Sequence, residues 1–253
     1  MIVEFFGPPG AGKTTLAGSI AAQMRQSGLE PKLVLSYRPN EHPVHVGAEA
    51  AHRSPAAAIR RLARPAVEFL SVTGRRNRHR GGLAATLLNL LPPKSIMWSI
   101  RMHQYLVRLG HTWREAAEAA EHVTLIDQGY LQAVYSLALL SGNTDRSRLE
   151  LALEIVPKPD LVVQLDVPKD VIARRLGERR RLQSRVERLL DLDIATNLGS
   201  LPIAALIADI MREKSFRVLQ IPAADRADLV QVTKQIANEI AASCSFYKER
   251  AHV

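Results

Sequence analysis

The sequence GPPGAGKTT occupies residues 7–15, near the start of a chain of 253 residues, and fits the pattern G-x-x-x-x-G-K-[ST]. Glycines let the backbone curl so that successive N–H groups point inward at anionic oxygens. In this pattern the lysine, here Lys13, reaches the β- and γ-phosphates of a nucleotide, and the hydroxyl of Thr14 ligates Mg²⁺. The stretch therefore predicts a phosphate-binding loop formed by Gly7, Gly10, Ala11, Gly12, Lys13, Thr14 and Thr15.

The residues on both sides of this loop support the prediction. Residues 2–6 (IVEFF) form a short, mostly apolar strand that runs into the loop. Leu16, Ile20 and Met24 then recur at the spacing of one helix face, and Gly28 is typical of a helix end. The N-terminus of such a helix carries a partial positive charge that favours a bound phosphate. A glycine-rich turn that binds nothing is the alternative, and the order strand, loop, helix argues against it.

The composition is that of an ordinary globular protein. Hydrophobic residues make up 47% of the chain and charged residues 23%, and 253 residues are enough for one large domain. The single cysteine, Cys244, cannot form an internal disulfide and fits a reducing compartment. No signal peptide precedes the first strand, and no uninterrupted apolar run approaches the roughly 18 residues of a membrane span. We therefore expect a cytoplasmic protein.

Five apolar stretches of strand length alternate with stretches of helix length, and they lie at residues 2–6, 32–37, 123–127, 161–167 and 217–221. This alternation is typical of a parallel sheet covered by helices on both faces. The long connection after the second strand contains helical patterns near residues 48–72 and 83–109, and further helices are expected near residues 201–211 and 225–243. The sequence thus predicts a single α/β domain over residues 1–253, with a helical insertion at about residues 48–115.

A carboxylate ends the third predicted strand. Residues 123–127 read VTLID, and Gln128, Gly129 and Tyr130 follow. In proteins with a phosphate loop of this kind, an aspartate at this place holds Mg²⁺ opposite the phosphates, and in kinases it can orient the acceptor hydroxyl. The alternative is that Asp127 caps the N-terminus of the next predicted helix, residues 131–140. We favour the magnesium role because the phosphate loop lies upstream.

Arginines crowd the helix predicted after the fourth strand. Pro168 suits the start of a helix, and the only acid among the five arginines is Glu178; the arginines are Arg174, Arg175, Arg179, Arg180 and Arg181. Arg175 and Arg179 are four residues apart and share a helix face. The planar guanidinium matches the charge that spreads over the γ-phosphate oxygens during phosphoryl transfer. An exposed basic helix face without a catalytic role is the alternative.

Together these signals resemble the nucleoside and nucleotide kinase group of P-loop proteins, with the thymidylate-kinase-like members nearest. The resemblance implies a three-layer sandwich whose parallel sheet has the strand order 2-3-1-4-5. It also implies that Arg175 and Arg179 belong to a lid at about residues 174–185 that closes over ATP, and that residues 222–225 lie by the adenine. ATP and Mg²⁺ are the expected cofactors, held by the phosphate loop, Thr14 and Asp127.

Two departures from this group point to an altered acceptor. Thymidylate kinases usually carry a carboxylate inside the phosphate loop, where this chain has Pro8 and Pro9. They also place an arginine after the strand-end aspartate, where this chain has Gln128. Because the second strand ends at the ligand crevice in this fold, Arg38 and Glu41 are the candidate acceptor residues, the first for an anionic group and the second as a base.

The positive charge of the chain is concentrated beside this candidate acceptor site. The net charge is +9 at pH 7, and residues 53–114 contain twelve Arg and Lys against one acid, Glu68, so this segment alone carries +11. The simplest role of the segment is to attract an acceptor that carries phosphate or carboxylate. Nucleic acid and an anionic membrane surface stay open as partners; residues 83–91 (LAATLLNLL), with Lys94, Trp98 and Arg101, suit the headgroup region.

The leading hypothesis is an ATP- and Mg²⁺-dependent phosphotransferase that acts on a small, anionic acceptor such as a nucleotide, a nucleoside or a sugar derivative. Its catalytic residues would be Lys13, Asp127, Arg175 and Arg179. The alternative is a P-loop ATPase or switch that acts on a protein or nucleic-acid partner. Such remodelling ATPases usually follow the strand-end aspartate with glutamate, where this chain has Gln128, and no Asn-Lys-x-Asp motif for guanine is present. The choice of ATP over GTP and the existence of a homodimer are not decided by the sequence.

Overall fold

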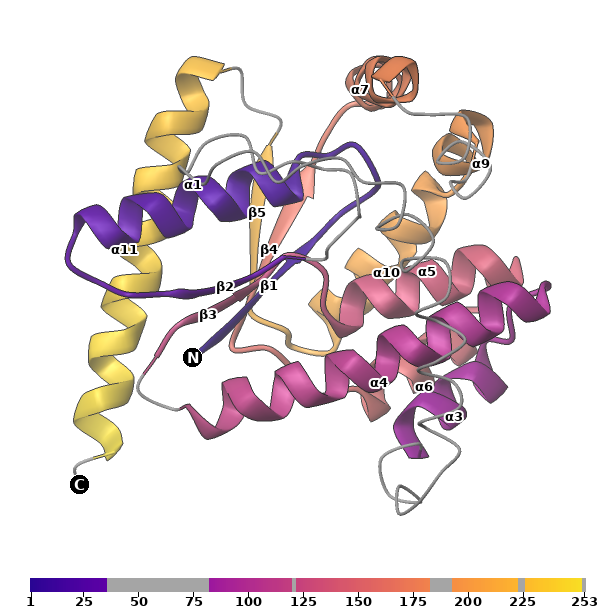
Figure 1. Ribbon diagram of the computed structural model, residues 1–253, viewed down its shortest axis with the longest axis horizontal. Helices are drawn as coiled ribbons and strands as arrows, with labels where there is room; N and C mark the ends of the chain where they lie inside the picture. The colour runs from indigo at the N-terminus through magenta and orange to yellow at the C-terminus, as the bar shows by residue number, and fades with distance from the viewer. Residues whose placement is uncertain (36–81, 120–121, 183–192, 223–225, 252–253) are drawn as a thin grey trace, which may run out of the picture.

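The five predicted strands pair into one parallel sheet in the order β2-β3-β1-β4-β5, as the sequence predicts (Figure 1). Their bounds are β1 Ile2–Phe6, β2 Lys32–Val34, β3 Thr124–Ile126, β4 Leu161–Asp166 and β5 Val218–Pro222. The computed structural model describes residues 1–35, 82–119, 122–182, 193–222 and 226–251. The predicted helix near residues 48–72 and most of the basic insertion therefore lie outside the described residues.

The central strand, β1, separates two hydrophobic cores by the alternation of its side chains. Val3 and Phe5 face the core formed with helix α1 (Lys13–Gln26) and helix α11 (Arg226–Ala251). Ile2 and Phe6 face the opposite core. All five residues of β1 are buried, as expected of a parallel strand covered on both faces. Glu4 points to the same face as Ile2 and Phe6, and it is the one charged residue of this strand.

Helices cover both faces of the sheet, which makes a three-layer sandwich (Figure 1). Helices α1 and α11 lie on one face and contact each other. The other face is covered by α3 Gly82–Leu90, α4 Ile96–Glu118, α5 Tyr130–Ser141, α6 Arg146–Ile155 and α10 Leu201–Glu213. Helix α7 (Lys169–Leu182) follows β4, and α9 (Ile194–Gly199) contacts it. The carboxyl end of β1 leads into the loop that begins at Gly7, and the carboxyl end of β3 lies beside it in the sheet.

The helix predicted over residues 83–109 is wrong as a single helix, because the structure breaks it into α3 and α4. Pro92 and Pro93 follow Leu91 in the sequence. A proline has no N–H to donate and disfavours helical geometry at the residue before it, so the first helix ends and a second begins. The N–H of Lys94 donates to the carbonyl of Leu140 at 3.0 Å, which fastens the linking segment to the end of α5.

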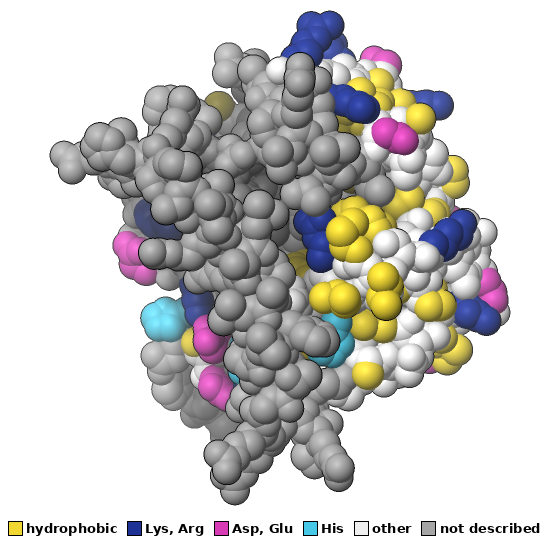
Figure 2. Space-filling model, turned by 45° about the vertical axis from the view of Figure 1, so that its right-hand side comes forward, with side chains coloured by type: hydrophobic (Ala, Val, Ile, Leu, Met, Phe, Trp, Pro, Cys, Tyr) yellow, Lys and Arg dark blue, Asp and Glu magenta, His cyan; other side chains and the backbone are white. Residues whose placement is uncertain are grey.

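The apolar residues of α3 pack into the protein core. Ala84, Leu87 and Leu91 are buried, and the remaining leucines of this segment pack against the same core. The leucine-rich stretch of residues 83–91 is therefore used for internal packing. The exposed apolar side chains lie further along, at Ile96, Met97 and Ile100 on the first turns of α4. Figure 2 shows hydrophobic side chains gathered beside Lys and Arg side chains in the right-hand half of the view.

One described stretch, Ile194–Glu213, is long and apolar enough by length and composition to cross a membrane. It comprises α9 and α10, which meet at Ser200. Its apolar side chains Ile203, Ile207 and Met211 are buried in the core beside α5 and α6. This is the pattern of a core helix in a globular protein.

The packing of α3 predicts a large difference between two leucine truncations. Leu87 is fully buried, whereas Leu151 on α6 is half exposed. Leu87→Ala is expected to lower the free energy of unfolding by about 3 kcal/mol, because it removes buried methyl groups and leaves a cavity. Leu151→Ala is expected to change it by about 0.5 kcal/mol or less. Urea unfolding of both variants tests this, and equal losses would contradict the position of α3 in the core.

Candidate active site

The phosphate loop connects the buried strand β1 to helix α1 in the predicted order. Gly12 precedes the helix at φ 100°, a left-handed conformation that glycine adopts without the strain a Cβ would cause. Helix α1 begins at Lys13, so the N–H groups of its first turn have no acceptor within the helix. None of the residues in this turn is acidic, so the turn itself supplies no charge that would oppose an anion at the positive end of the helix dipole. The loop and the helix start together present donors to an anion.

Lys13 is buried in this loop, and the loop itself holds its ammonium group. Its Nζ donates to the carbonyl oxygens of Gly7 at 2.7 Å and of Pro8 at 3.0 Å. Only 6% of the side chain is exposed, so the charge depends on these oxygens for its solvation. The ammonium group of Lys13 therefore lies within the loop, against its backbone, as the sequence motif predicts.

Asp127 lies directly across from the start of α1. The hydroxyl of Thr14 donates to Oδ2 of Asp127 at 2.8 Å, although 113 positions separate the two residues. The carboxyl end of β3 lies beside β1 in the sheet, with Glu4 opposite Ile126, and this pairing sets the distance. Asp127 is fully buried. The two residues that the sequence assigns to Mg²⁺ are thus in contact.

Glu4, and not Asp127, caps the helix that follows. Helix α5 starts at Tyr130 with Gly129 before it, and no side chain of its own first turn makes a capping hydrogen bond. Instead Oε1 of Glu4 accepts hydrogen bonds from the N–H groups of Leu131 at 2.7 Å and Gln132 at 3.2 Å. Our alternative interpretation of Asp127 as the cap of this helix therefore does not hold in the structure.

A role for Glu4 in the site was not predicted from the sequence. The signal that could have revealed it is the presence of a charged residue in the apolar strand IVEFF. The side chain is fully buried, and Oε2 accepts no hydrogen bond from the described residues. Burial raises the pKa of Glu4 from 4.5 to about 8, and the hydrogen bonds from the start of α5 oppose this shift. Burial thus favours the protonated form of the Glu4 carboxyl in the folded protein.

Tyr105 of α4 reaches the same turn from another side. Its hydroxyl donates to the carbonyl of Gln128 at 2.8 Å. Burial raises the pKa of Tyr105, and the neighbouring carboxyls of Glu4 and Asp127 raise it further. The hydroxyl therefore keeps its proton and remains a donor throughout the physiological range.

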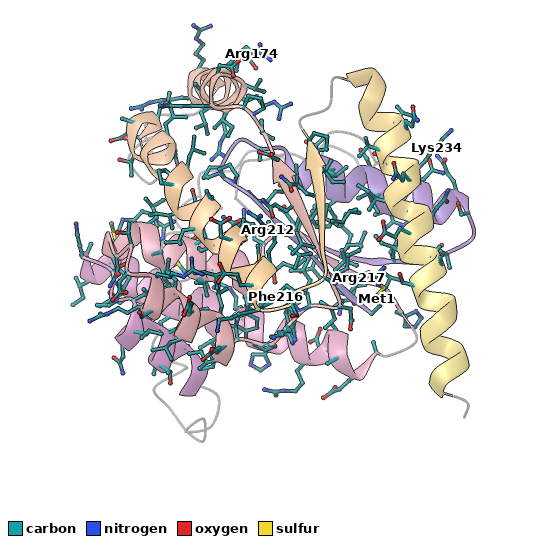
Figure 3. All side chains as sticks on the ribbon, turned by 180° about the vertical axis from the view of Figure 1, so that it is seen from behind. Met1, Arg174, Arg212, Phe216, Arg217 and Lys234 are labelled. Atoms are coloured by element: carbon teal, nitrogen blue, oxygen red, sulfur yellow. The ribbon has the colours of Figure 1, made fainter. Side chains whose placement is uncertain are left out.

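Arg175 of α7 lies on the phosphate loop. Its guanidinium donates to the carbonyl of Ala11 at 3.0 Å and lies 3.5 Å from the carbonyl of Gly10. Arg179, one turn further along α7, is partly buried. Arg174 is exposed and points away from the loop (Figure 3). On this helix, the structure brings Arg175 to the loop. The last three residues of the predicted lid, 183–185, lie outside the described residues.

The acceptor side of the site is only partly described. Arg38 and Glu41 lie outside the described residues, as do residues 223–225 of the predicted adenine loop. Of the twelve basic residues of segment 53–114, four lie in the described part of the chain: Lys94, Arg101, Arg108 and Arg114. Arg101 stacks over the ring of Trp98 at 4.6 Å from its centroid. A guanidinium that stacks on a neighbouring ring is held in place by that contact, so it is less available to bind a ligand.

The residues that are present fit a magnesium–nucleotide group. Mg²⁺ prefers oxygen ligands and is usually bound by one or two side chains together with substrate phosphates. Thr14 and Asp127 supply two such oxygens in contact, next to a buried lysine and the first turn of a helix. Among the described residues no cluster of three or more His, Cys, Asp or Glu forms a separate metal site.

Comparison with known proteins supports the fold. No protein-family model matches the sequence, and no curated protein matches it. A structure of deoxyadenosine kinase from M. mycoides with dCMP and dCDP bound is similar over 96% of this chain and 100% of its own, with 13% identity and a TM-score of 0.51. A second structure of that kinase, with bound dCTP, covers the same shares at 15% identity and a TM-score of 0.44. The fold of this chain is thus similar to that of a deoxyadenosine kinase, while the thymidylate-kinase-like specificity remains a prediction.

The protonated Glu4 gives stability a pH dependence of definite sign. Between pH 4.5 and about 8 the folded state binds a proton that the unfolded state releases, so the contribution of Glu4 is full at low pH and is lost as the pH rises through about 8. Glu4→Gln has no such proton. We expect the free energy of unfolding of the wild type to fall relative to that of Glu4→Gln, by up to about 1.4 kcal/mol per pH unit.

Urea unfolding of both proteins at intervals from about pH 5 to about pH 9 measures this difference. When the two proteins are compared at the same pH, the contributions of all other titratable groups to the free energy of unfolding cancel, because the proteins differ at a single side chain. A difference that stays constant over this range would show that Glu4 is ionised in the folded protein.

Proposed function

We propose that this protein is an ATP- and Mg²⁺-dependent kinase that transfers the γ-phosphoryl group to a small acceptor such as a nucleotide, a nucleoside or a sugar derivative, with anionic acceptors favoured. The observation that carries the proposal is the contact of Thr14 with Asp127 beside the buried Lys13, at the carboxyl end of a sheet with the order β2-β3-β1-β4-β5. The likeness in fold to a nucleoside kinase places nucleosides and nucleotides among the acceptors to test first.

The roles of the residues follow from their chemistry. Lys13 and the N–H groups of the first turn of α1 would hold the β- and γ-phosphates, because both are hydrogen-bond donors at the phosphate loop. Thr14 and Asp127 would hold Mg²⁺, which when bound neutralises charge on the phosphate oxygens. Asp127 is also the described residue best placed to orient the acceptor hydroxyl, with Glu41 as the alternative base.

The arginines of α7 would act on the charge that develops during transfer. Arg175 already lies on the loop, where its partners are neutral carbonyl oxygens. A hydrogen bond from a guanidinium to an ionised oxygen is roughly twice as strong as one between neutral groups, so we expect phosphate oxygens to replace these carbonyls. Arg179 would follow from the same helix, and Arg38 would bind an anionic group of the acceptor. In this scheme α7 forms the first part of a lid over about residues 174–185.

A screen of nucleosides, nucleotides, sugars and sugar phosphates tests the function. A kinase consumes ATP in proportion to the acceptor and forms a phosphorylated product, whereas ATP consumption that is independent of every acceptor would favour an ATPase or switch. Phosphorylated product and ADP are to be measured in the same reaction, so that transfer and hydrolysis are counted separately.

Lys13→Ala is expected to lower the rate of this transfer by about 10²-fold or more, because it removes a preorganised donor from the phosphates. Lys158→Ala is the matched control: Lys158 is an exposed lysine before β4, and its ammonium lies 4.9 Å from the centre of the Phe216 ring. This variant is expected to keep the rate of the wild type. Transfer that survives Lys13→Ala unchanged would contradict the proposed function.

A further inference from the structure

The turn that carries Asp127 is held by three side chains, of which two, Tyr105 and Glu4, take no part in the scheme above. It comprises residues 127–129, between β3 and α5. Tyr105 donates to the carbonyl of Gln128, and Glu4 accepts from the first amides of α5. Thr14 contacts Asp127 itself. Side chains from three different elements, α4, β1 and α1, therefore contact this turn or the first amides of α5 directly after it.

Gly129 and Glu4 fit together without spare room. A Cβ on Gly129 would lie 2.4 Å from Cδ of Glu4 and 2.5 Å from its Oε2, well inside van der Waals contact. The carboxyl cannot swing aside freely, because the side chain is fully buried and Oε1 holds two amides of α5. Any larger residue at 129 must therefore displace either Glu4 or the turn.

The charged and titratable groups around Glu4 come from three elements. They are Tyr105 of α4, Tyr130 of α5 and Asp127, which follows β3. Burial raises the pKa of both tyrosines, and Glu4 raises it further. Tyr105 forms its hydrogen bond as a phenol, and Glu4 holds the amides of α5 through an oxygen that the neutral carboxyl retains. The turn is thus fixed by hydrogen bonds that do not require an ion pair.

We propose that Glu4, Tyr105 and Gly129 are positioning residues for phosphoryl transfer, which fix the turn 127–129 so that Asp127 stays against Thr14. This inference rests on the proposed function, since it takes Asp127 as the residue that holds Mg²⁺ with the nucleotide. Displacement of a reacting group by as little as about 1 Å can cost 10²-fold in rate, so a loose turn would weaken the site although every ligand is still present.

A pair of tyrosine variants separates positioning from mere stability. Tyr105→Phe removes a hydroxyl that is bonded to the turn. Tyr135→Phe removes a buried hydroxyl that is bonded to Ser200, directly before α10, and it keeps the ring that packs on Phe6. The quantity to measure is the ratio of the dissociation constants for ATP without and with Mg²⁺, by calorimetric titration. We expect Tyr105→Phe to lower this ratio by about tenfold, and Tyr135→Phe to keep it within about twofold.

The glutamate and glycine variants test the second contact. Glu4→Gln keeps an oxygen acceptor for the amides of α5, so we expect it to retain the magnesium dependence of ATP binding at neutral pH. Gly129→Ala is expected to reduce that dependence by about tenfold or more, with weak ATP binding in the absence of Mg²⁺ left unchanged. The thermal unfolding temperature of each variant identifies any loss that comes from a failure to fold.

The outcomes distinguish the two proposals. If the wild type binds ATP no better with Mg²⁺ than without it, the proposed function fails and the positioning role fails with it. If the wild type shows the magnesium dependence and Tyr105→Phe matches Tyr135→Phe, only the positioning role is overturned. A folded Gly129→Ala with the magnesium dependence of the wild type would overturn it as well.

Discussion

The hydrogen bond between Thr14 and Asp127 is the contact on which the rest of the site depends. It joins the first turn of α1 to the end of β3, and its length of 2.8 Å is set by the pairing of β1 with β3 in the sheet. Both strands are short and buried, so their register is fixed by the two cores on either face. The pairing of β1 with β3 therefore brings a hydroxyl and a carboxylate from distant parts of the chain into contact.

Two cations of the site are held by neutral oxygens. Lys13 donates to the carbonyls of Gly7 and Pro8, and Arg175 donates to that of Ala11. Carbonyl oxygens are sufficient to solvate a buried charge, but an ionised phosphate oxygen is a stronger acceptor. In the proposed function, the phosphates of a nucleotide would therefore compete with these carbonyls for Lys13 and Arg175. The neutral Glu4 fits this arrangement, since a second ionised carboxylate near Asp127 would oppose the binding of phosphate.

The parts of the structure that local patterns determine were predictable from the sequence. The glycine spacing predicted the phosphate loop, and the apolar runs predicted the strands. The resemblance to a known group predicted the strand order, and the phosphate loop upstream favoured a position of Asp127 opposite the phosphates. The helix break at Pro92 and Pro93 was missed, because the apolar residues on both sides of the two prolines suggested one continuous helix. The role of Glu4 could not be read locally, because its partners Leu131 and Gln132 lie more than a hundred positions away. The same applies to Tyr105, whose partner is a backbone carbonyl and so leaves no trace in the residue types.

A crystal structure of the protein with Mg²⁺ and a non-hydrolysable ATP analogue tests the central claim most directly. The account predicts that the β- and γ-phosphates lie within the loop of residues 7–14, in contact with Lys13, and that the metal lies between Thr14 and Asp127. A nucleotide bound elsewhere, or a metal that is held by other side chains with Asp127 turned away, would contradict it.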